Sequence, residues 1–273
     1  MEFSIVRQQF IQEVRQPESD INLARAALLI AQEAYPVLDI ELCLCEIQGI
    51  ADDIHSRLPT ERYPLKVLHV INSVLFDDLG FRGNEDDYYD PDNSYLNVVL
   101  ERRRGIPITL SLVYLEVAAR LDFPMVGVGL PGHFVVRPDI DGCEIFVDGF
   151  HGGDILFPDD CKTLLGSIYS RPVELDPDFL RPVPPKQFLM RLLGNLKGIY
   201  LSKKDISEAL SIVNRMLILF PDNVQQTRDR GLLHYQVGNL EPARWDLENY
   251  LTLSPLAEDR ALIRRLLTRM GNS

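Results

Sequence analysis

The chain has 273 residues, of which 46% are hydrophobic, and a formal net charge of −12 at pH 7. This length and apolar fraction suit one large or two modest domains with a buried core. The acidic balance argues against a nucleic-acid-binding protein, which normally carries a basic footprint, and against docking on anionic membranes.

The cysteines and the N-terminal segment indicate the cellular compartment in which we expect the protein. The four cysteines form no Cys-x-x-Cys pair, so we expect reduced thiols and a cytoplasmic protein. The N-terminal segment lacks a cationic region followed by an apolar run, so we expect no signal peptide. No apolar stretch approaches the roughly 20 residues that cross a bilayer, so we expect no membrane partner.

Residues 1–80 are predicted to form a helical region ahead of the core. Apolar residues recur at helical spacing in four segments, at about 3–14, 21–35, 38–58 and 60–79. We expect Ser19 and Asp20 to cap the second helix. Gly80 follows the last segment, at a position where helix termination favours glycine. This region carries no motif of catalytic chemistry.

Residues 81–94 are predicted to be an acidic loop, followed by a short helix at 95–103. The carboxylates of the loop do not match the twelve-position spacing of an EF-hand, so we expect a solvated loop rather than a calcium site. The helix ends in an arginine cluster, Arg102, Arg103 and Arg104. Two interpretations are open: a solvated helix end with favourable dipole interactions, or the binding of a carboxylate or phosphate group.

The stretch from Gly105 to Gly153 is predicted to be the core of the protein. Residues 105–121 are apolar on all sides, which predicts a buried helix with Pro107 in its first turn. Three short runs of β-branched and aromatic residues follow, and they predict a small antiparallel sheet. These runs lie at 125–129, 133–137 and 143–148.

The last two of these strands place a histidine opposite an aspartate. A turn centred on residues 139–142 sets Val135 opposite Phe146 and His133 opposite Asp148, all on one face of the sheet. A carboxylate beside an imidazole fixes the tautomer of the ring and raises its basicity. His133 and Asp148 therefore fit the base and the orienting residue of a nucleophilic triad.

A buried helix followed by strands that carry His and then Asp resembles the papain and transglutaminase superfamily. The resemblance implies a nucleophilic cysteine at the start of the helix, where the helix dipole lowers its pKa. On this alignment the cysteine position is Pro107. Thr109 and Ser111 lie within the next turn and are the candidate replacement nucleophiles. The alternative is that both hydroxyls bond backbone groups near the helix start.

His151 adds a second imidazole near the His133–Asp148 face. These three residues and Asp154 can be proposed as metal ligands, but the sequence has no fixed-spacing framework such as His-Glu-x-x-His. We therefore expect a hydrogen-bonded polar rim with no metal and no cofactor. His151 and the three arginines remain candidate ligand-binding residues.

The C-terminal part is predicted to consist of tetratricopeptide-like helical repeats, preceded by a proline-rich linker. Ala209 and Ala243, and likewise Pro221 and Pro255, are separated by the 34-residue period of that repeat. Small residues at the first of these positions let paired helices approach closely. Such helix pairs commonly bind a protein or peptide, which is the partner that we expect; their alternative role is to cover the core.

Three motifs, at 96–121, 127–137 and 147–153, resemble the SirB-type transglutaminase-like proteins, and the resemblance extends over nearly the whole chain. It implies an α+β fold with a transglutaminase-like (papain-like) core, built from a buried helix and a small antiparallel sheet. The implied parts are an N-terminal helical region at 1–80, the core at 81–175 and the repeats at 186–273.

The resemblance predicts the fold of the protein more directly than it predicts a reaction. We predict a non-catalytic or degenerate transglutaminase-like scaffold that binds a protein or peptide through its repeats. The alternative is a papain- or transglutaminase-like hydrolase or acyl transferase. It would use His133 and Asp148 with Thr109 or Ser111 as an atypical nucleophile.

Overall fold

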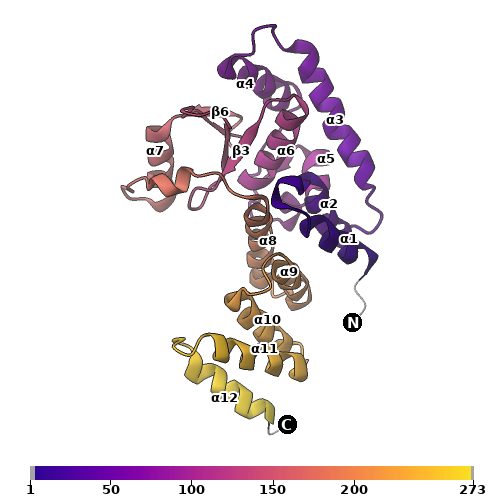
Figure 1. Ribbon diagram of the computed structural model, residues 1–273, viewed down its shortest axis with the longest axis vertical. Helices are drawn as coiled ribbons and strands as arrows, with labels where there is room; N and C mark the ends of the chain where they lie inside the picture. The colour runs from indigo at the N-terminus through magenta and orange to yellow at the C-terminus, as the bar shows by residue number, and fades with distance from the viewer. Residues whose placement is uncertain (1–3, 272–273) are drawn as a thin grey trace. The chain divides into compact units, whose positions relative to one another are not determined.

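The computed structural model describes residues 4–271, and the chain divides into two compact units, Met1–Leu189 and Met190–Ser273 (Figure 1). The first unit combines helices with two small sheets, and the second is helical. The N-terminal helical region and the core, which the sequence presents as separate parts, both lie in the first unit.

The first unit opens with a group of helices. They are α1 (Ile5–Val14), α2 (Leu23–Ala34), α3 (Ile40–Arg57) and α4 (Pro64–Asn72), and a π-helical turn at Ser73–Asp78 continues the last one. The predicted cap of α2 was wrong. Asn22 is the cap, because its side chain accepts the Arg25 N–H at 2.8 Å, whereas Ser19 and Asp20 lie in a separate 3₁₀ turn.

The acidic segment predicted to be a loop contains regular structure. Arg82–Gly83 forms strand β1, which pairs in parallel with β2, Arg104–Gly105. A 3₁₀ turn at Pro91–Ser94 then leads into α5, Leu96–Arg102. Strands of two residues carry no hydrophobic alternation, so sequence pattern alone does not predict them.

Helix α6, Pro107–Arg120, is the buried helix of the core, as its apolar composition predicts. Leu112, Tyr114 and Val117 are fully covered. The helix packs against α2 and α3, and also against strands β3 and β4. Its first turn begins at Pro107, where the missing N–H of proline has no helical partner to lose.

The main sheet has four antiparallel strands in sequential order. They are β3 (Met125–Val128), β4 (Val135–Pro138), β5 (Phe146–Asp148) and β6 (Asp154–Leu156), of which β6 was not predicted. The predicted register was wrong by two residues, because Val136 lies opposite Val147 and not opposite Ile145. Since side chains alternate along a strand, an even shift leaves each one on its predicted face.

Both faces of this sheet are covered. Val135 and Phe146 pack against Cys161 and Leu165 of helix α7, Pro158–Tyr169. The segment predicted to be a linker also returns to the sheet, since the Val183 N–H donates to the Gly127 carbonyl at 2.8 Å. It therefore belongs to the first unit.

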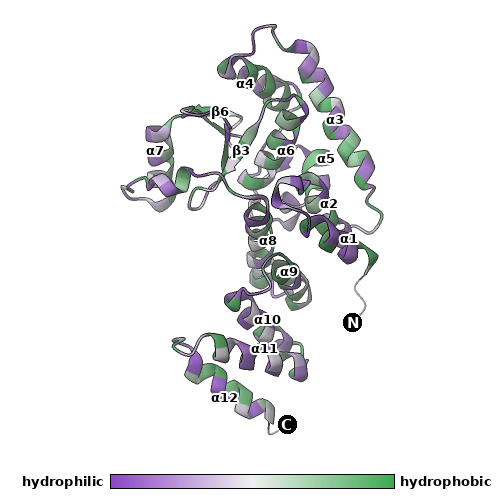
Figure 2. Ribbon diagram, in the orientation of Figure 1, coloured by the Kyte–Doolittle hydropathy of each residue, from purple (hydrophilic) through white to green (hydrophobic). Residues whose placement is uncertain are grey.

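The second unit consists of successive antiparallel helices. After the end of α8 (Pro185–Ser202) come α9 (Ile206–Leu219), α10 (Val224–Gln236), α11 (Leu240–Leu253) and α12 (Arg260–Gly271). Ala209 and Ala243 are fully buried, in line with the predicted close approach of paired helices. Figure 2 shows polar and apolar residues mixed along α12, whose Ile263 and Met270 are buried.

Candidate functional site

The start of α6 holds Thr109 and Ser111, the two candidate nucleophiles. The Thr109 hydroxyl donates to the Asn93 carbonyl at 2.8 Å and accepts the Ile106 N–H at 3.1 Å. The Ser111 hydroxyl points to the Phe134 carbonyl, 3.5 Å away. Both residues are buried, at 0% and 1% exposure. Within the described residues, the hydrogen bonds of both hydroxyls go to backbone groups and not to an imidazole.

His133 and Asp148 form a buried pair at the main sheet. The Nε2 atom of His133 lies 2.7 Å from Oδ2 of Asp148, which is the hydrogen bond expected from their shared face. Asp148 ends strand β5, and His133 follows a tight turn in which Gly132 has φ of +80°. A residue with a Cβ rarely adopts this left-handed conformation, so glycine permits the turn that directs His133 to the carboxylate.

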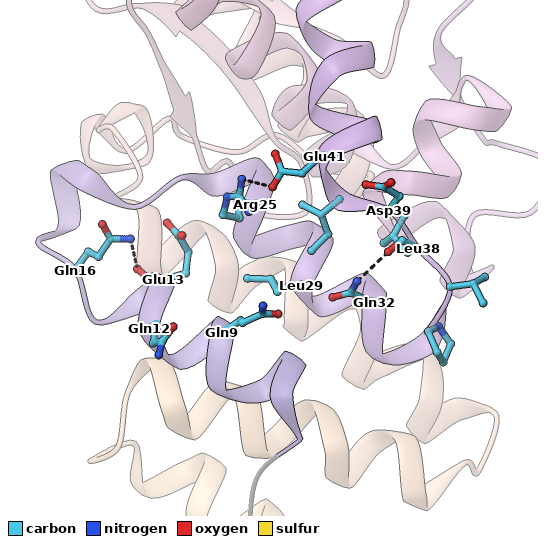
Figure 3. A pocket seen from close by; sticks show the side chains of 13 residues that line it. Gln9, Gln12, Glu13, Gln16, Arg25, Leu29, Gln32, Leu38, Asp39 and Glu41 are labelled. Atoms are coloured by element: carbon cyan, nitrogen blue, oxygen red, sulfur yellow. Dashed lines mark hydrogen bonds and ion pairs between the residues drawn. The ribbon is translucent and has the colours of Figure 1, made fainter.

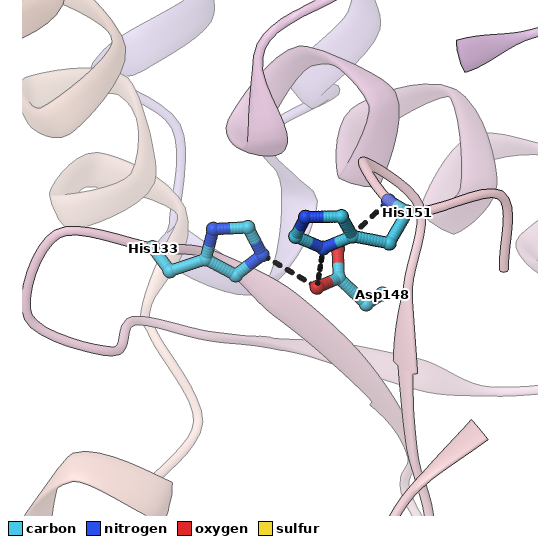
Figure 4. Close-up of side chains that lie close together, drawn as sticks. All are labelled: His133, Asp148 and His151. Carbon is cyan, nitrogen blue, oxygen red and sulfur yellow. Dashed lines mark hydrogen bonds and ion pairs between the residues drawn. The ribbon is translucent and has the colours of Figure 1, made fainter. Parts of the chain in front are cut away.

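A second imidazole binds the same carboxylate oxygen. Nδ1 of His151 lies 2.7 Å from Oδ2 of Asp148, while Oδ1 accepts the backbone N–H groups of Phe150 and His151 at 3.0 and 3.4 Å (Figure 4). The His133 and Asp148 side chains are 6% and 1% exposed, whereas that of His151 is 41% exposed. Asp148 is therefore the centre of the cluster, and His151 is its solvent-facing member.

The hydrogen bonds of the cluster determine its protonation. Burial by itself raises the pKa of the Asp148 carboxyl, but the hydrogen bonds from His133 and His151 outweigh it and hold that pKa well below its usual range. The hydrogen bond to Asp148 raises the pKa of His151, against a smaller opposite effect of burial. Asp148 is thus ionised at neutral pH and acts as the acceptor for both rings.

Comparison with known proteins places this geometry in a family. Residues 41–194 match the transglutaminase-like superfamily, and residues 196–268 match a tetratricopeptide repeat. The chain belongs to the transglutaminase-like superfamily. The match confirms the predicted fold class, a transglutaminase-like domain with C-terminal tetratricopeptide repeats.

Relatives of this transglutaminase-like protein span bacteria and animals. A UPF0162 protein of Xylella fastidiosa (strain 9a5c) is 37% identical over 259 residues, which cover 93% of this chain and 92% of the relative. A UPF0162 protein of Pseudomonas aeruginosa is 30% identical, with coverage of 91% and 90%. F-box only protein 21 of Mus musculus is 34% identical over 82% of this chain but only 40% of its own length. No solved structure matches.

An aromatic ring that sequence reasoning missed supports both imidazoles of the transglutaminase-like domain. The Phe150 ring packs edge-on against His133 and His151, at centroid distances of 6.0 and 5.2 Å. Its backbone carbonyl accepts the Gly83 N–H at 3.1 Å, so strand β1 is attached to the cluster. The turn is also held by Asn72, whose side chain donates to the Gly153 carbonyl at 2.6 Å and accepts the Tyr114 hydroxyl at 2.9 Å.

A pocket of about 420 Å³ opens beside His151. Besides His151, it is lined by Arg82, Gly83, Glu85, Asp86, Arg104, Phe150 and Gly152. Of the three predicted arginines only Arg104 lines it, and Arg104 also pairs with Asp86 at 3.6 Å. Arg82 was missed by sequence analysis, because the pairing of Arg82 with Arg104 across β1 and β2 follows no sequence pattern.

The other two arginines of the predicted cluster have acidic partners elsewhere in the first unit. Arg102 pairs with Asp92 at 2.6 Å and with Asp90 at 3.3 Å. Arg103 pairs with Glu46 at 2.8 Å, and its guanidinium lies 4.7 Å from the centre of the Phe81 ring. Neither of them lines the pocket beside His151. Carboxylates of the first unit therefore pair with both Arg102 and Arg103.

The cluster also brings metal-ligand atoms together. One ligand atom from each of His133, Asp148 and His151 lies within 4.8 Å of the others. Asp154, the fourth residue considered from the sequence, pairs with Asp148 in the backbone register of β5 and β6 but is not part of this set.

A larger pocket, of about 720 Å³, lies among helices α1, α2 and α3 (Figure 3). Its lining is rich in glutamine, with Gln9, Gln12, Gln16 and Gln32. It contains none of the predicted site residues. Within residues 4–271, no helix is both long and apolar enough to cross a membrane.

Proposed function

We propose that this protein is a non-catalytic or degenerate transglutaminase-like protein, of the SirB type, that acts as a protein- or peptide-binding scaffold. The observation that carries the proposal is Pro107 in the first turn of α6, where the resemblance to papain-like enzymes requires a cysteine. The tetratricopeptide match over residues 196–268 supports the binding role, because such repeats generally mediate protein–protein interaction.

The chemistry of a papain-like site explains why the proline matters. Covalent catalysis needs a nucleophile at the helix start, within hydrogen-bond reach of the base. Proline offers no such group, and the nearby hydroxyls of Thr109 and Ser111 are buried and bonded to backbone carbonyls. Activation of either hydroxyl would require it to leave its backbone carbonyl and reach the imidazole of His133.

One observation favours the alternative, a hydrolase or acyl transferase. The His133–Asp148 pair has the 2.7 Å geometry of a base with its orienting carboxylate, and a pocket lies beside the cluster. In that function His133 is the base, Asp148 orients it, and Thr109 or Ser111 is the nucleophile. Arg104 and His151 then hold the substrate in the pocket.

Covalent labelling separates the two functions. The wild-type protein is incubated with a fluorophosphonate, which modifies activated hydroxyls, and its intact mass is measured. The scaffold proposal expects no adduct. An adduct on Thr109 or Ser111 that disappears in His133→Ala overturns the proposal in favour of the hydrolase.

A designed thiol tests the same site in the opposite direction. In the Pro107→Cys variant, the helix start and the His133–Asp148 pair should lower the pKa of the new thiol. We expect it to react with iodoacetamide faster than the native cysteines, and to lose that advantage when His133→Ala is added. Equal reactivity with and without His133 would show that position 107 is not aligned with the base.

The binding role is tested with a photo-crosslinking amino acid. Trp245 in the repeats is 73% exposed and Leu42 in the N-terminal helices is 68% exposed, so they form a matched pair of positions. In intact cells, we expect protein crosslinks from position 245 and few from position 42. Equal yields from both positions would contradict binding through the repeats.

The four free cysteines support a reducing compartment, and we propose the cytoplasm.

A further inference from the structure

His133 and His151 each direct a ring nitrogen at the same carboxylate oxygen of Asp148, and the three ligand atoms lie within 4.8 Å of one another. Both nitrogens lie 2.7 Å from Oδ2 of Asp148, and dashed lines mark the two contacts in Figure 4. Imidazole and carboxylate together suit zinc and other divalent first-row transition metals. We propose that this cluster binds one such ion, an inference that goes beyond the scaffold function and does not depend on it.

The geometry requires only a small adjustment. Ligand atoms at about 2.1 Å from a tetrahedral zinc ion lie roughly 3.4 Å from one another, so each 2.7 Å nitrogen–oxygen contact must lengthen by about 0.7 Å. The His151 side chain is 41% exposed and can rotate, whereas the buried His133–Asp148 contact lengthens through a shift of one of these two side chains. The proton on each facing nitrogen moves to the other ring nitrogen or to solvent, because a ligating imidazole nitrogen carries no proton.

Asp148 is positioned as metal-binding carboxylates usually are. Its second oxygen accepts the backbone N–H groups of Phe150 and His151, and its carbonyl accepts the Gly153 N–H at 2.9 Å. Hydrogen bonds to the non-ligating atoms orient metal ligands and raise metal affinity. The turn from Asp148 to Gly153 therefore fixes the direction of the carboxylate before any ion arrives.

Three protein ligands leave coordination positions open. Sites of this kind keep water or a substrate as a further ligand, whereas structural zinc sites have four protein ligands. Of the three residues, His151 lines the pocket of about 420 Å³, so we expect the open positions to face it. Arg82 and Arg104 line the same pocket, so a carboxylate or phosphate group fits as the additional ligand.

Metal binding is measured on the full chain after treatment with a chelator. Zn²⁺ is titrated by calorimetry, and Co²⁺ by its visible absorption, which reports coordination geometry. His151→Ala is the main variant, because its exposed position makes unfolding a small concern, and Asp148→Asn is the second. His55→Ala, an exposed histidine on α3, is the matched control.

The proposal expects one equivalent of Zn²⁺ on the wild-type protein and on His55→Ala. In His151→Ala we expect at least a 100-fold loss of affinity, more than the 10- to 100-fold loss typical of an outer-shell residue. Unchanged binding in His151→Ala overturns the proposal, as does a wild-type protein that binds neither ion at millimolar concentration. Thiolate-to-cobalt absorption would also overturn it, by assigning the ion to a cysteine such as the exposed Cys45.

Discussion

A Cβ atom added at Gly83 would lie 2.7 Å from the ring of Phe150, closer than such atoms approach in real proteins. The contact links strand β1 to the aromatic ring that supports both imidazoles. Glycine at position 83 is therefore a condition for the cluster, and it acts through close approach rather than through a special backbone angle.

We predict that Gly83→Ala destabilises the protein by about 1–3 kcal/mol, because the ring and the backbone carbonyl of Phe150 must both move. Thermal unfolding followed by circular dichroism measures the effect. Gly49→Ala is the control, because its Cβ meets nothing within 4 Å inside helix α3. There we expect a gain of up to about 1 kcal/mol from helix propensity. A neutral Gly83→Ala would contradict the close contact.

In the second unit, Gly231 marks the close approach of α10 and α11. An added Cβ would lie 2.8 Å from Cγ of Leu247 and 3.0 Å from Cβ of Asp246. We predict that Gly231→Ala lowers the urea midpoint despite the better helix propensity of alanine, since the clash outweighs about 1 kcal/mol. Gly198→Ala, with nothing within 4 Å, should leave the midpoint unchanged or raise it. A higher urea midpoint for Gly231→Ala than for Gly198→Ala would contradict the close packing at Gly231.

Thiol chemistry should distinguish Cys161 from Cys45. Burial, with smaller contributions from Asp160 and Asp148, raises the pKa of the Cys161 thiol to about 11. At pH 8 only about 0.1% of it is the reactive thiolate, and the residue has no exposed surface. We predict that iodoacetamide alkylates the exposed Cys45 first and Cys161 only on unfolding, as peptide mass spectrometry would record. Equal rates at pH 8 would contradict the buried position.

Acid should weaken the second unit through Asp259. Burial raises the pKa of this carboxyl, but hydrogen bonds from Tyr250 and Arg228 outweigh it and leave the pKa below its ordinary value. Because the folded pKa is the lower one, the stabilisation is present above about pH 4 and is lost as the pH falls through the folded pKa.

Urea unfolding of Asp259→Asn at pH 7 and pH 3 tests this effect. The variant should be less stable than the wild type at pH 7, and the difference should shrink at pH 3. The exposed Asp222→Asn serves as the control and should show little change at pH 7. If the loss of stability in Asp259→Asn were larger at pH 3 than at pH 7, the pKa of Asp259 would not be lowered in the folded protein.

The sequence predicted helix α6 and the His133–Asp148 pair because each follows from a clear hydrophobic pattern. The all-round apolar helix has one interpretation, and the alternation of the strands kept His133 and Asp148 on one face even though the register was wrong by two residues. The sequence did not predict strands β1, β2 and β6, because two or three residues are too few to show the alternation of apolar and polar side chains. The attachment of His151 to Oδ2 of Asp148 depends on a turn with positive φ at Gly152 and Gly153, which no local pattern specifies.

The turn from Asp148 to Gly153 is irregular and partly open to solvent, yet it is tied down from several directions. Asn72 donates to the Gly153 carbonyl, Gly83 donates to that of Phe150, and the N–H groups of Phe150 and Gly153 both donate to Asp148. In hydrogen–deuterium exchange, those last two amides should therefore exchange as slowly as amides of regular structure. Slow exchange would show that the backbone of this loop is as rigid as the rest of the domain. The motion at the cluster would then belong to the His151 side chain.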